Sequence, residues 1–269
     1  MILSGSELVK TIRIEQADRA AALLAEHSIM PKLVIIRDSD NPVINKYVQM
    51  KINYGESIGV EVENRLVSTE HLVAEIDRAN NEDTVHGIIV QLPIQASKEE
   101  TETIVGHIKP AKDVDGLTGK GEFHSATAGA IDQLIRGYNI DLSKRRIAII
   151  GYGKLVGEPL TQMWRDRGLT VEMFRKSDGR DISQYLHDYD LIVTATGVPE
   201  LIKSDMISPG TVLVDAGTAS EKGVIVGDVE EALRQRDDID ITPKIGGVGP
   251  LTVSTLFSNV LQSTENSVK

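Results

Sequence analysis

The chain has 269 residues, a length that suits two modest domains better than a single core. Its 29 basic and 40 acidic residues give a net charge of −11, which repels phosphate backbones and argues against nucleic acid as a partner. The absence of cysteine excludes disulfides, thiolate metal sites and a cysteine nucleophile.

The N-terminal segment lacks the basic-then-apolar pattern of a signal peptide. No apolar run approaches the ~18 residues that a membrane span needs. None of the six histidines pairs at the spacing of a zinc-binding helix, so we expect no metal site. We therefore expect a cytoplasmic protein without a membrane partner.

Apolar, β-branched runs alternate with segments of helical period along the chain. The expected strands are 33–37, 59–65, 87–93, 146–151, 169–174, 190–197 and 211–217. The expected helices are 6–26, 43–57, 69–79, 98–108, 129–137, 156–167, 229–235 and 251–263, and Ser97 with Glu100 predicts a capping box. This alternation predicts an α/β fold with largely parallel sheets.

A glycine-containing stretch, KDVDGLTGKGEF, indicates a domain boundary near residue 120. We predict a first α/β domain over 1–119 and a Rossmann-like domain over 120–250. The amphipathic segment 251–264 is expected to be a helix that returns to the first domain.

The first half carries a candidate lysine site. Tyr47 and Lys51 stand at i and i+4, so they share one helix face. Gln91 follows a buried strand at its carboxyl end, where α/β sites gather, and Asp115 lies in the loop KDVDG. Taken alone, most Tyr/Lys pairs at this spacing belong to an ordinary amphipathic surface, and loop aspartates are more often turn formers than ligands.

The second half carries a glycine turn. A strand runs into Gly151, Gly153 and Gly157 and then into a helical segment, as in turns that bind a pyrophosphate at a helix N-terminus. The next strand ends in Arg175 and Lys176, which favour the 2′-phosphate of NADP, although Arg180 suits this role equally and NAD stays open. A plain solvated basic turn is the alternative.

In order and spacing, several motifs together resemble the bifunctional methylenetetrahydrofolate dehydrogenase/cyclohydrolase family over nearly the whole chain. These motifs are YVQMK (47–51), GIIVQLPI (87–94), KPAKDVDG (109–116), IIGYGKLVGEP (149–159), TATGVP (194–199), VDAG (214–217), VGDV (226–229) and TPKIGGVGPLT (242–252).

The resemblance implies a folate cleft between the domains, homodimers formed through the nucleotide domain, and tetrahydrofolate derivatives as substrates. Lys51 would be the central catalytic group, tuned by Gln91, with Tyr47 along the folate and Asp115 on the pterin. Other substrate contacts would come from Leu92, Gly249 and Pro250. Cofactor contacts would come from Gly151, Tyr152, Gly153, Val156, Gly157, Arg175, Lys176, Thr196, Gly197 and Thr218.

The sequence departs from the family mainly on the nucleotide side. Tyr152 and Gly153 replace the usual Arg and Ser, and Arg175-Lys176 replaces a His-Ser pair. Thr218 stands where a hydrophobic residue is usual, and on the folate side Ile44 replaces a small polar residue. Three alternatives stay open: an enzyme with only the cyclohydrolase activity, a non-catalytic folate or nucleotide sensor, and another NADP oxidoreductase of similar shape.

Overall fold

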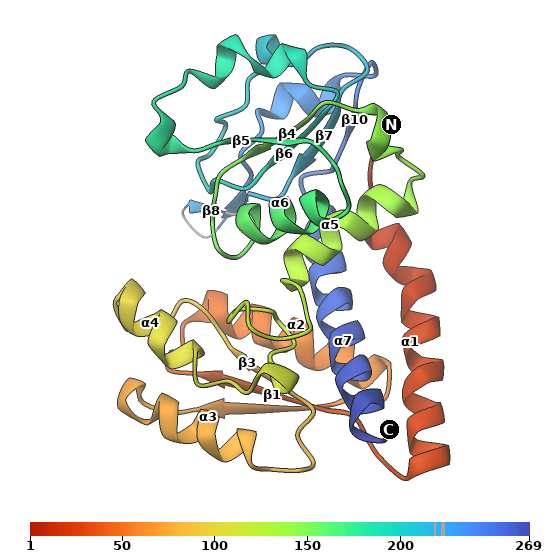
Figure 1. Cartoon of the computed structure of the whole chain (residues 1–269), viewed down its shortest axis with the longest axis vertical. Helices are drawn as coiled ribbons and strands as arrows, with labels where there is room; N and C mark the ends of the chain where they lie inside the picture. The colour runs from red at the N-terminus through yellow and green to blue at the C-terminus, as the bar shows by residue number, and fades with distance from the viewer. Residues whose placement is uncertain (218, 222–223) are drawn as a thin grey trace. The chain divides into compact units, whose positions relative to one another are not determined.

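The computed structural model describes residues 1–217, 219–221 and 224–269, and it divides into two compact units (Figure 1). We call them the lysine unit (Lys10–Ala126 with Val253–Lys269) and the glycine-turn unit (Met1–Val9 with Thr127–Thr252). The first nine residues join the later part of the chain because Leu3 and Ile241 pair through their backbones, N to O at 2.8 Å. Among the described residues, no helix is long and apolar enough to cross a membrane.

The lysine unit is built on a three-stranded parallel sheet in the order β2-β1-β3. Strands β1 and β3 are apolar and buried almost throughout, as expected when helices cover a parallel sheet. The elements of this unit are α1 (Gly5–His27, from Lys10 on), β1 (Lys32–Arg37), α2 (Pro42–Ser57), β2 (Glu61–Leu66), α3 (Leu72–Asn80), β3 (Gly87–Val90), α4 (Lys98–Val105) and most of α7 (Val248–Ser267). Helix α4 begins with the predicted capping box.

The C-terminal helix returns to the lysine unit, as the sequence predicts, and lies beside α1 (Figure 1). Gln16 of α1 donates from Nε2 to the Ser254 carbonyl and to the Ser258 hydroxyl, both at 2.7 Å. Tyr54 of α2 donates to Gln16 Oε1 at 2.6 Å, and its ring lies 5.2 Å from that of Phe257. Because these polar groups are buried and paired, they fix α7 against α1 and α2.

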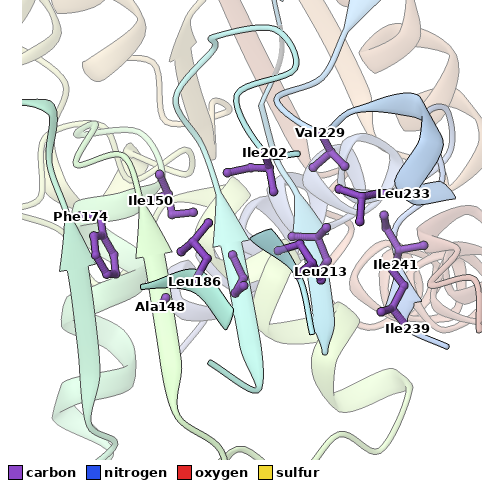
Figure 2. Packing of buried hydrophobic residues seen from close by; sticks show 12 residues of the cluster. Ala148, Ile150, Phe174, Leu186, Ile202, Leu213, Val229, Leu233, Ile239 and Ile241 are labelled. Atoms are coloured by element: carbon purple, nitrogen blue, oxygen red, sulfur yellow. The ribbon is translucent and has the colours of Figure 1, made fainter. Parts of the chain in front are cut away.

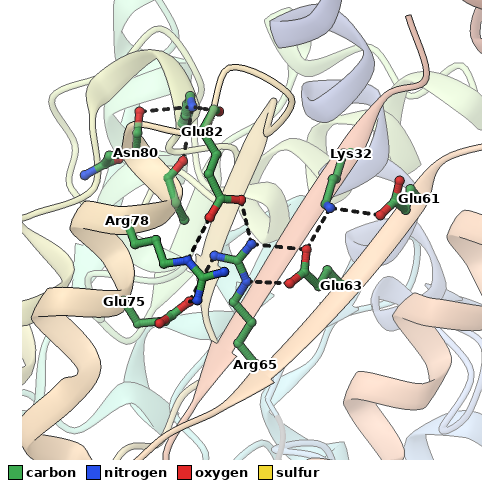
Figure 3. Close-up of polar contacts among 10 residues, drawn as sticks. Lys32, Glu61, Glu63, Arg65, Glu75, Arg78, Asn80 and Glu82 are labelled. Carbon is green, nitrogen blue, oxygen red and sulfur yellow. Dashed lines mark hydrogen bonds and ion pairs between the residues drawn. The ribbon is translucent and has the colours of Figure 1, made fainter.

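A charged network ties the edge strand β2 to α3 (Figure 3). The nearly buried Arg65 guanidinium contacts Glu63 at 2.7 Å, Glu75 at 3.0 Å and Glu82 at 2.7 Å. Hydrogen bonds from Arg65 and Lys32 lower the pKa of Glu63 to about 2. The buried cation is thus compensated by several carboxylates, as a charge in this position requires.

The glycine-turn unit contains a five-stranded parallel sheet in the order β10-β7-β6-β4-β5, which confirms the predicted Rossmann-like domain. Its strands are β4 (Ile147–Ile150), β5 (Val171–Phe174), β6 (Leu191–Thr194), β7 (Val212–Asp215) and β10 (Asp240–Ile241), with a hairpin of β8 (Ala219–Glu221) and β9 (Val224–Val226). Its helices are α5 (Ala126–Gly137) and α6 (Gly157–Asp166).

Short 3-10 segments complete the described chain. They are Thr69–His71, Pro110–Lys112, Leu142–Lys144, Lys176–Asp178, Ile182–Gln184, Leu186–Asp188, Ser204–Met206 and Glu231–Gln235. The last of these corrects one prediction: the segment 229–235 was expected to be an α-helix. Only Glu231–Gln235 is helical, as a 3-10 segment, and Leu233 is the one residue within those bounds that the unit buries, so no apolar stripe supports an α-helix there.

One face of the large sheet is covered by a continuous hydrophobic cluster (Figure 2). The cluster takes side chains from every strand of the sheet and from the segments that follow β5, β6 and β7. Its labelled members in Figure 2 are Ala148, Ile150, Phe174, Leu186, Ile202, Leu213, Val229, Leu233, Ile239 and Ile241. This packing fixes the carboxyl ends of the strands, which carry the glycine turn and the loops around it.

The buried Asp132 joins α5 to α6. It accepts from Trp164 Nε1 at 2.9 Å and from two Arg167 nitrogens at 2.6 and 2.9 Å. Burial by itself raises the pKa of Asp132, but the hydrogen bonds from Arg167 and Trp164 outweigh it and hold the pKa below its ordinary value.

We expect Asp132→Ala to lower the free energy of unfolding of this unit by about 2 kcal/mol, because it leaves the buried Trp164 N–H without its acceptor. Trp164 is the only tryptophan in the chain, so its fluorescence during urea unfolding reports on this contact directly. The matched control is Gln162→Ala on the exposed face of α6, which should change stability by less than about 0.5 kcal/mol. Equal losses in the two variants would contradict this account.

Candidate functional site

The candidate lysine site begins on α2. Asn41 caps this helix by accepting from Val43 N, and Pro42 occupies the first helical position. Tyr47 and Lys51 lie one turn apart and are both partly buried, so they share the helix face that is neither fully solvated nor in the core.

Strand β3 brings Gln91 to Lys51. The Gln91 backbone N–H donates to the Ile36 carbonyl at 2.8 Å, which extends the β1–β3 pairing and places Gln91 at the carboxyl end of the sheet. Lys51 Nζ donates to Gln91 Oε1 at 2.8 Å. The Gln91 amide nitrogen in turn donates to the Leu92 carbonyl at 2.9 Å, which fixes the amide with its oxygen toward the lysine.

The charges of Lys51 and Asp115 interact across this site. Burial lowers the pKa of the Lys51 ammonium below its ordinary value, and the charge of Asp115 opposes part of that shift. Burial holds the pKa of Asp115 above its ordinary value. The charge of Lys51 opposes this rise, and the charge of nearby Asp113 adds to it. Among the described residues, none donates a hydrogen bond to the Asp115 carboxylate, so its oxygens are available to a ligand.

The loop that carries Asp115 is held by its neighbours in the KDVDG motif. The fully buried Asp113 accepts from Leu117 N at 3.0 Å, Thr118 N at 2.8 Å and the Thr118 hydroxyl at 2.6 Å. Lys112 Nζ donates to three backbone carbonyls at the end of α3, the nearest at 2.7 Å. The two carboxylates of the motif therefore differ in role: Asp113 shapes the loop, and Asp115 has no hydrogen-bond donor among the residues that the structure describes.

The candidate dinucleotide site begins at the glycine turn after β4. Gly151 has φ +98°, which favours glycine. A Cβ at Gly157 would lie 1.9 Å from the Gly151 carbonyl oxygen, so the turn closes on itself and leads directly into α6. At Gly153, by contrast, a Cβ would meet no atom within 4 Å. Val156 is the N-cap residue of α6, and its N–H donates to the Gly153 carbonyl at 3.2 Å.

The segment after β6 forms the neighbouring wall of this site. A Cβ at Gly151 would lie 2.5 Å from the Ala195 carbonyl oxygen, so the glycine turn touches this segment. Gly197 has φ +68°, and Thr196 is held by Asp228 through its N–H and its hydroxyl. Open space beside Gly153, a tight turn and a helix N-terminus are the features that an approaching pyrophosphate needs.

Three cations follow β5, and the structure separates their roles. The Arg175 guanidinium stacks 4.0 Å above the Tyr152 ring of the glycine turn. Lys176 is exposed, and no described residue pairs with its ammonium. Arg180 is engaged with Glu172 at 2.7 Å and lies over the Phe174 ring. Arg175 and Lys176 are therefore the cations available to a phosphate.

The remaining sequence candidates lie outside these two clusters. Gly249 is exposed and Pro250 partly buried in the first turn of α7, in the glycine-turn unit. Thr218 lies outside the described residues. Within the part of the chain that the structure describes, no group of three or more His, Asp or Glu side chains could hold a metal ion. A hollow lined by Asp141, Lys144, Arg145 and Asp190 lies at the amino ends of β4 and β6, at the opposite end of these strands from the glycine turn.

The fold and the two clusters define an α/β protein that joins a dinucleotide-type unit to a unit with a partly buried lysine–glutamine pair. Residues 3–115 match the catalytic domain of tetrahydrofolate dehydrogenase/cyclohydrolase, and residues 125–268 match the NAD(P)-binding domain of the same family. The chain belongs to the tetrahydrofolate dehydrogenase/cyclohydrolase family.

Individual relatives agree with this assignment. The bifunctional protein FolD of Burkholderia orbicola (strain AU 1054) is 33% identical over 281 residues, with 99% of this chain and 98% of that protein covered. The crystal structure of the bifunctional FolD dehydrogenase/cyclohydrolase from Campylobacter jejuni has a TM-score of 0.90 at 33% identity, covering 99% of each chain. The Trypanosoma brucei enzyme, solved with NADP cofactor and inhibitor, has a TM-score of 0.91 at 27% identity, covering 100% of this chain and 98% of that one.

Proposed function

We propose that this protein oxidises 5,10-methylenetetrahydrofolate to the 5,10-methenyl form with NADP and then hydrolyses that product to 10-formyltetrahydrofolate. The observation that carries the proposal is the Lys51–Gln91 hydrogen bond, close to the carboxylate of Asp115, to which no described side chain donates a hydrogen bond. A protein that only bound folate would gain nothing from a partly buried lysine held by a glutamine. The glycine turn supports the other activity, the oxidation with NADP.

The folate would be held by the lysine unit. The carboxylate of Asp115 is suited to the paired amino and ring N–H donors of a pterin, because a carboxylate accepts two parallel hydrogen bonds. Tyr47 offers an aromatic face one turn before Lys51, along which a flat ring system packs. Leu92 lies beside Gln91 at the carboxyl end of β3 and would be a further folate contact. Gly249 and Pro250 are assigned to the folate by the family motif alone.

The residues of the glycine-turn unit fit an NADP molecule. Gly151, Gly153, Val156 and Gly157 would place the pyrophosphate at the start of α6, with Thr196 and Gly197 on the neighbouring wall and Thr218 as a further contact. Arg175 and Lys176 would bind the 2′-phosphate, with Tyr152 beneath the guanidinium. NADP supplies the hydride acceptor for the first step, and the protein aligns the methylene carbon with it.

The hydrolytic step needs proton transfer. Water adds to the electrophilic methenyl carbon and loses one proton to give a hydroxyl adduct. The bond from this carbon to one ring nitrogen then breaks as that nitrogen gains a proton, and the hydroxyl loses its own proton to become the formyl carbonyl. Burial lowers the pKa of Lys51, which favours the neutral amine that would take the proton from water. Gln91 keeps the amine oriented through the hydrogen bond at 2.8 Å.

Purified protein tests this proposal against another NADP oxidoreductase of similar shape. With methylenetetrahydrofolate and NADP, we expect the absorbance of NADPH to rise. With a panel of cyclic hydroxy acids and amino acids, we expect no NADPH. Turnover of a hydroxy acid with no turnover of the folate would overturn the assignment.

The charge at position 91 should set the pH profile of hydrolysis. In Gln91→Glu, the new carboxylate favours the protonated lysine and raises the pKa of Lys51, so the neutral amine appears at higher pH. We expect the acid limb of kcat/KM to move up by about one pH unit or more. The control Gln49→Glu makes the same change on the exposed face of α2 and should leave the profile unmoved. Superimposable profiles for Gln91→Glu and wild type would contradict the role of Lys51 as a base.

We also propose that the protein is a cytoplasmic homodimer formed through the glycine-turn unit. Strand β5 ends the five-stranded sheet, so among the described strands its outer edge has no partner. An open edge of this kind can pair with a second copy. Light scattering should give twice the chain mass of 29.3 kDa, and a monomer mass at micromolar concentration would contradict the dimer.

A further inference from the structure

A buried polar cluster joins the carboxyl ends of three strands in the glycine-turn unit. We call Asp215, Asp228 and Arg234 the strand-end cluster. Arg234 contacts Asp215 Oδ2 at 2.6 Å, and Asp215 Oδ1 accepts from the backbone N–H of Asp228 at 3.1 Å. The Asp215 N–H donates to the Thr242 hydroxyl at 2.9 Å. The cluster thus links the ends of β7 and β10 to the segment that contains Asp228.

The side chain of Asp228 then connects the cluster to β6. Asp228 is fully buried, and its Oδ2 accepts three hydrogen bonds. They come from the Thr194 hydroxyl at 2.6 Å, the Thr196 N–H at 2.7 Å and the Thr196 hydroxyl at 2.9 Å. Hydrogen bonds to an ionised carboxylate are stronger than those between neutral groups. This one oxygen therefore fixes the direction in which the chain leaves β6.

Two glycines leave room for these carboxylates. A Cβ at Gly217 would lie 2.0 Å from Asp228 Oδ1, and a Cβ at Gly227 would lie 2.0 Å from Asp215 Oδ2. The motifs VDAG (214–217) and VGDV (226–229) therefore interlock, each supplying an aspartate and the glycine that accommodates the other. Any side chain at either glycine would displace a carboxylate.

The segment that Asp228 holds is also the one that the glycine turn touches. The close approach of Gly151 to the Ala195 carbonyl leaves no room for a side chain between the two walls. Ala195 lies between Thr194 and Thr196, the two residues bonded to Asp228. A shift of this segment would therefore change the space beside the glycine turn.

We propose that Asp228 is a positioning residue for the dehydrogenase step, because its carboxylate holds the 194–197 segment against the glycine turn and so shapes the dinucleotide site. Asp228 acts through Thr194 and Thr196, and its own side chain is fully buried. The inference rests on the proposed function for the identity of the ligand. A purely structural role would lower stability without a selective effect on NADP.

The test compares wild type, Asp228→Ala, Asp228→Asn and Asp132→Ala. The last is the matched control, because it removes another buried carboxylate of the same unit, away from the strand ends. For each we would measure the NADP Kd by calorimetry, the NADP KM, the thermal midpoint, and methenyl hydrolysis without nucleotide. The proposed proton-transfer groups of hydrolysis, Lys51 and Gln91, lie in the lysine unit, so hydrolysis serves as an internal control for folding.

We expect Asp228→Ala to raise the NADP Kd and KM about tenfold or more, since two hydrogen bonds that hold Thr196 are lost. Asp228→Asn keeps a neutral acceptor and should raise them about threefold. Hydrolysis should stay at the wild-type rate in both, and Asp132→Ala should lower the thermal midpoint with the NADP Kd unchanged. If Asp228→Ala does not fold, the NADP Kd and KM of Asp228→Asn test the inference in its place.

A wild-type NADP Kd in a folded Asp228 variant would overturn the inference, as would an equal rise in Asp132→Ala. Either result would leave the proposed function intact if wild type still binds and reduces NADP. A wild-type protein that binds no NADP would overturn both.

Discussion

Replacing Lys51 with alanine is expected to lower the rate of methenyltetrahydrofolate hydrolysis about a thousandfold, the usual contribution of a positioned proton-transfer group. The reason is local. Lys51 is the basic group whose pKa burial lowers beside Gln91 and Asp115, and alanine leaves no group to take the proton from water. The measurement is the loss of methenyl absorbance without nucleotide, corrected for spontaneous hydrolysis.

Two further variants make this result specific. Lys46→Ala removes an exposed lysine from the same helix and should leave hydrolysis at the wild-type rate. Lys51→Arg keeps the positive charge but cannot supply a neutral base near pH 7, so it should be as slow as the alanine variant. NADP affinity should be unchanged in all three, since its proposed contacts lie in the other unit. Unchanged hydrolysis by folded Lys51→Ala would overturn the account of the site.

The second large effect concerns the choice of cofactor. In Arg175→Ala/Lys176→Asp, we expect the ratio of kcat/KM for NADP to that for NAD to fall about a hundredfold, about tenfold for each lost charge on the 2′-phosphate. NAD lacks that phosphate, so its own kcat/KM should change little. The measurement is the rate of methylenetetrahydrofolate oxidation over a range of each cofactor.

Arg180→Ala is the matched control for this double variant. It removes a cation from the same strand end, but one that already pairs with Glu172 and stacks on Phe174, so the cofactor ratio should stay close to that of wild type. Tyr152→Phe should retain the ratio, and Tyr152→Ala should lower it, because the ring supports Arg175. Equal losses of kcat/KM with both cofactors in the double variant would refute the assignment of Arg175 and Lys176 to the 2′-phosphate.

Much of the fold follows from local sequence patterns. Strands such as Ile147–Ile150 and Leu191–Thr194 are almost wholly apolar and buried, as is typical of parallel strands covered on both faces. Ser97 and Glu100 form the predicted capping box because that motif is complete within four residues. The returning helix α7 was predictable from its apolar period, although its partners Gln16 and Tyr54 were not.

The contacts that build the sites depend on distant parts of the chain. Lys51 and Gln91 are 40 residues apart, and Thr194 and Asp228 are 34 apart, so no local pattern predicts either pair. The stacking of Arg175 on Tyr152 likewise depends on how β4 and β5 align. Family motifs mark such residues without giving their partners; VGDV is the clearest case, since the pattern alone gives Asp228 no role.

Whether one chain carries both activities is tested most directly by a paired assay on the purified wild-type protein. The first arm follows methylenetetrahydrofolate oxidation with NADP and with NAD, and the second follows methenyltetrahydrofolate hydrolysis without nucleotide. We predict turnover in both arms, with NADP preferred over NAD. Binding of folate and NADP with no turnover in either arm would contradict the account and leave a sensor on the same scaffold.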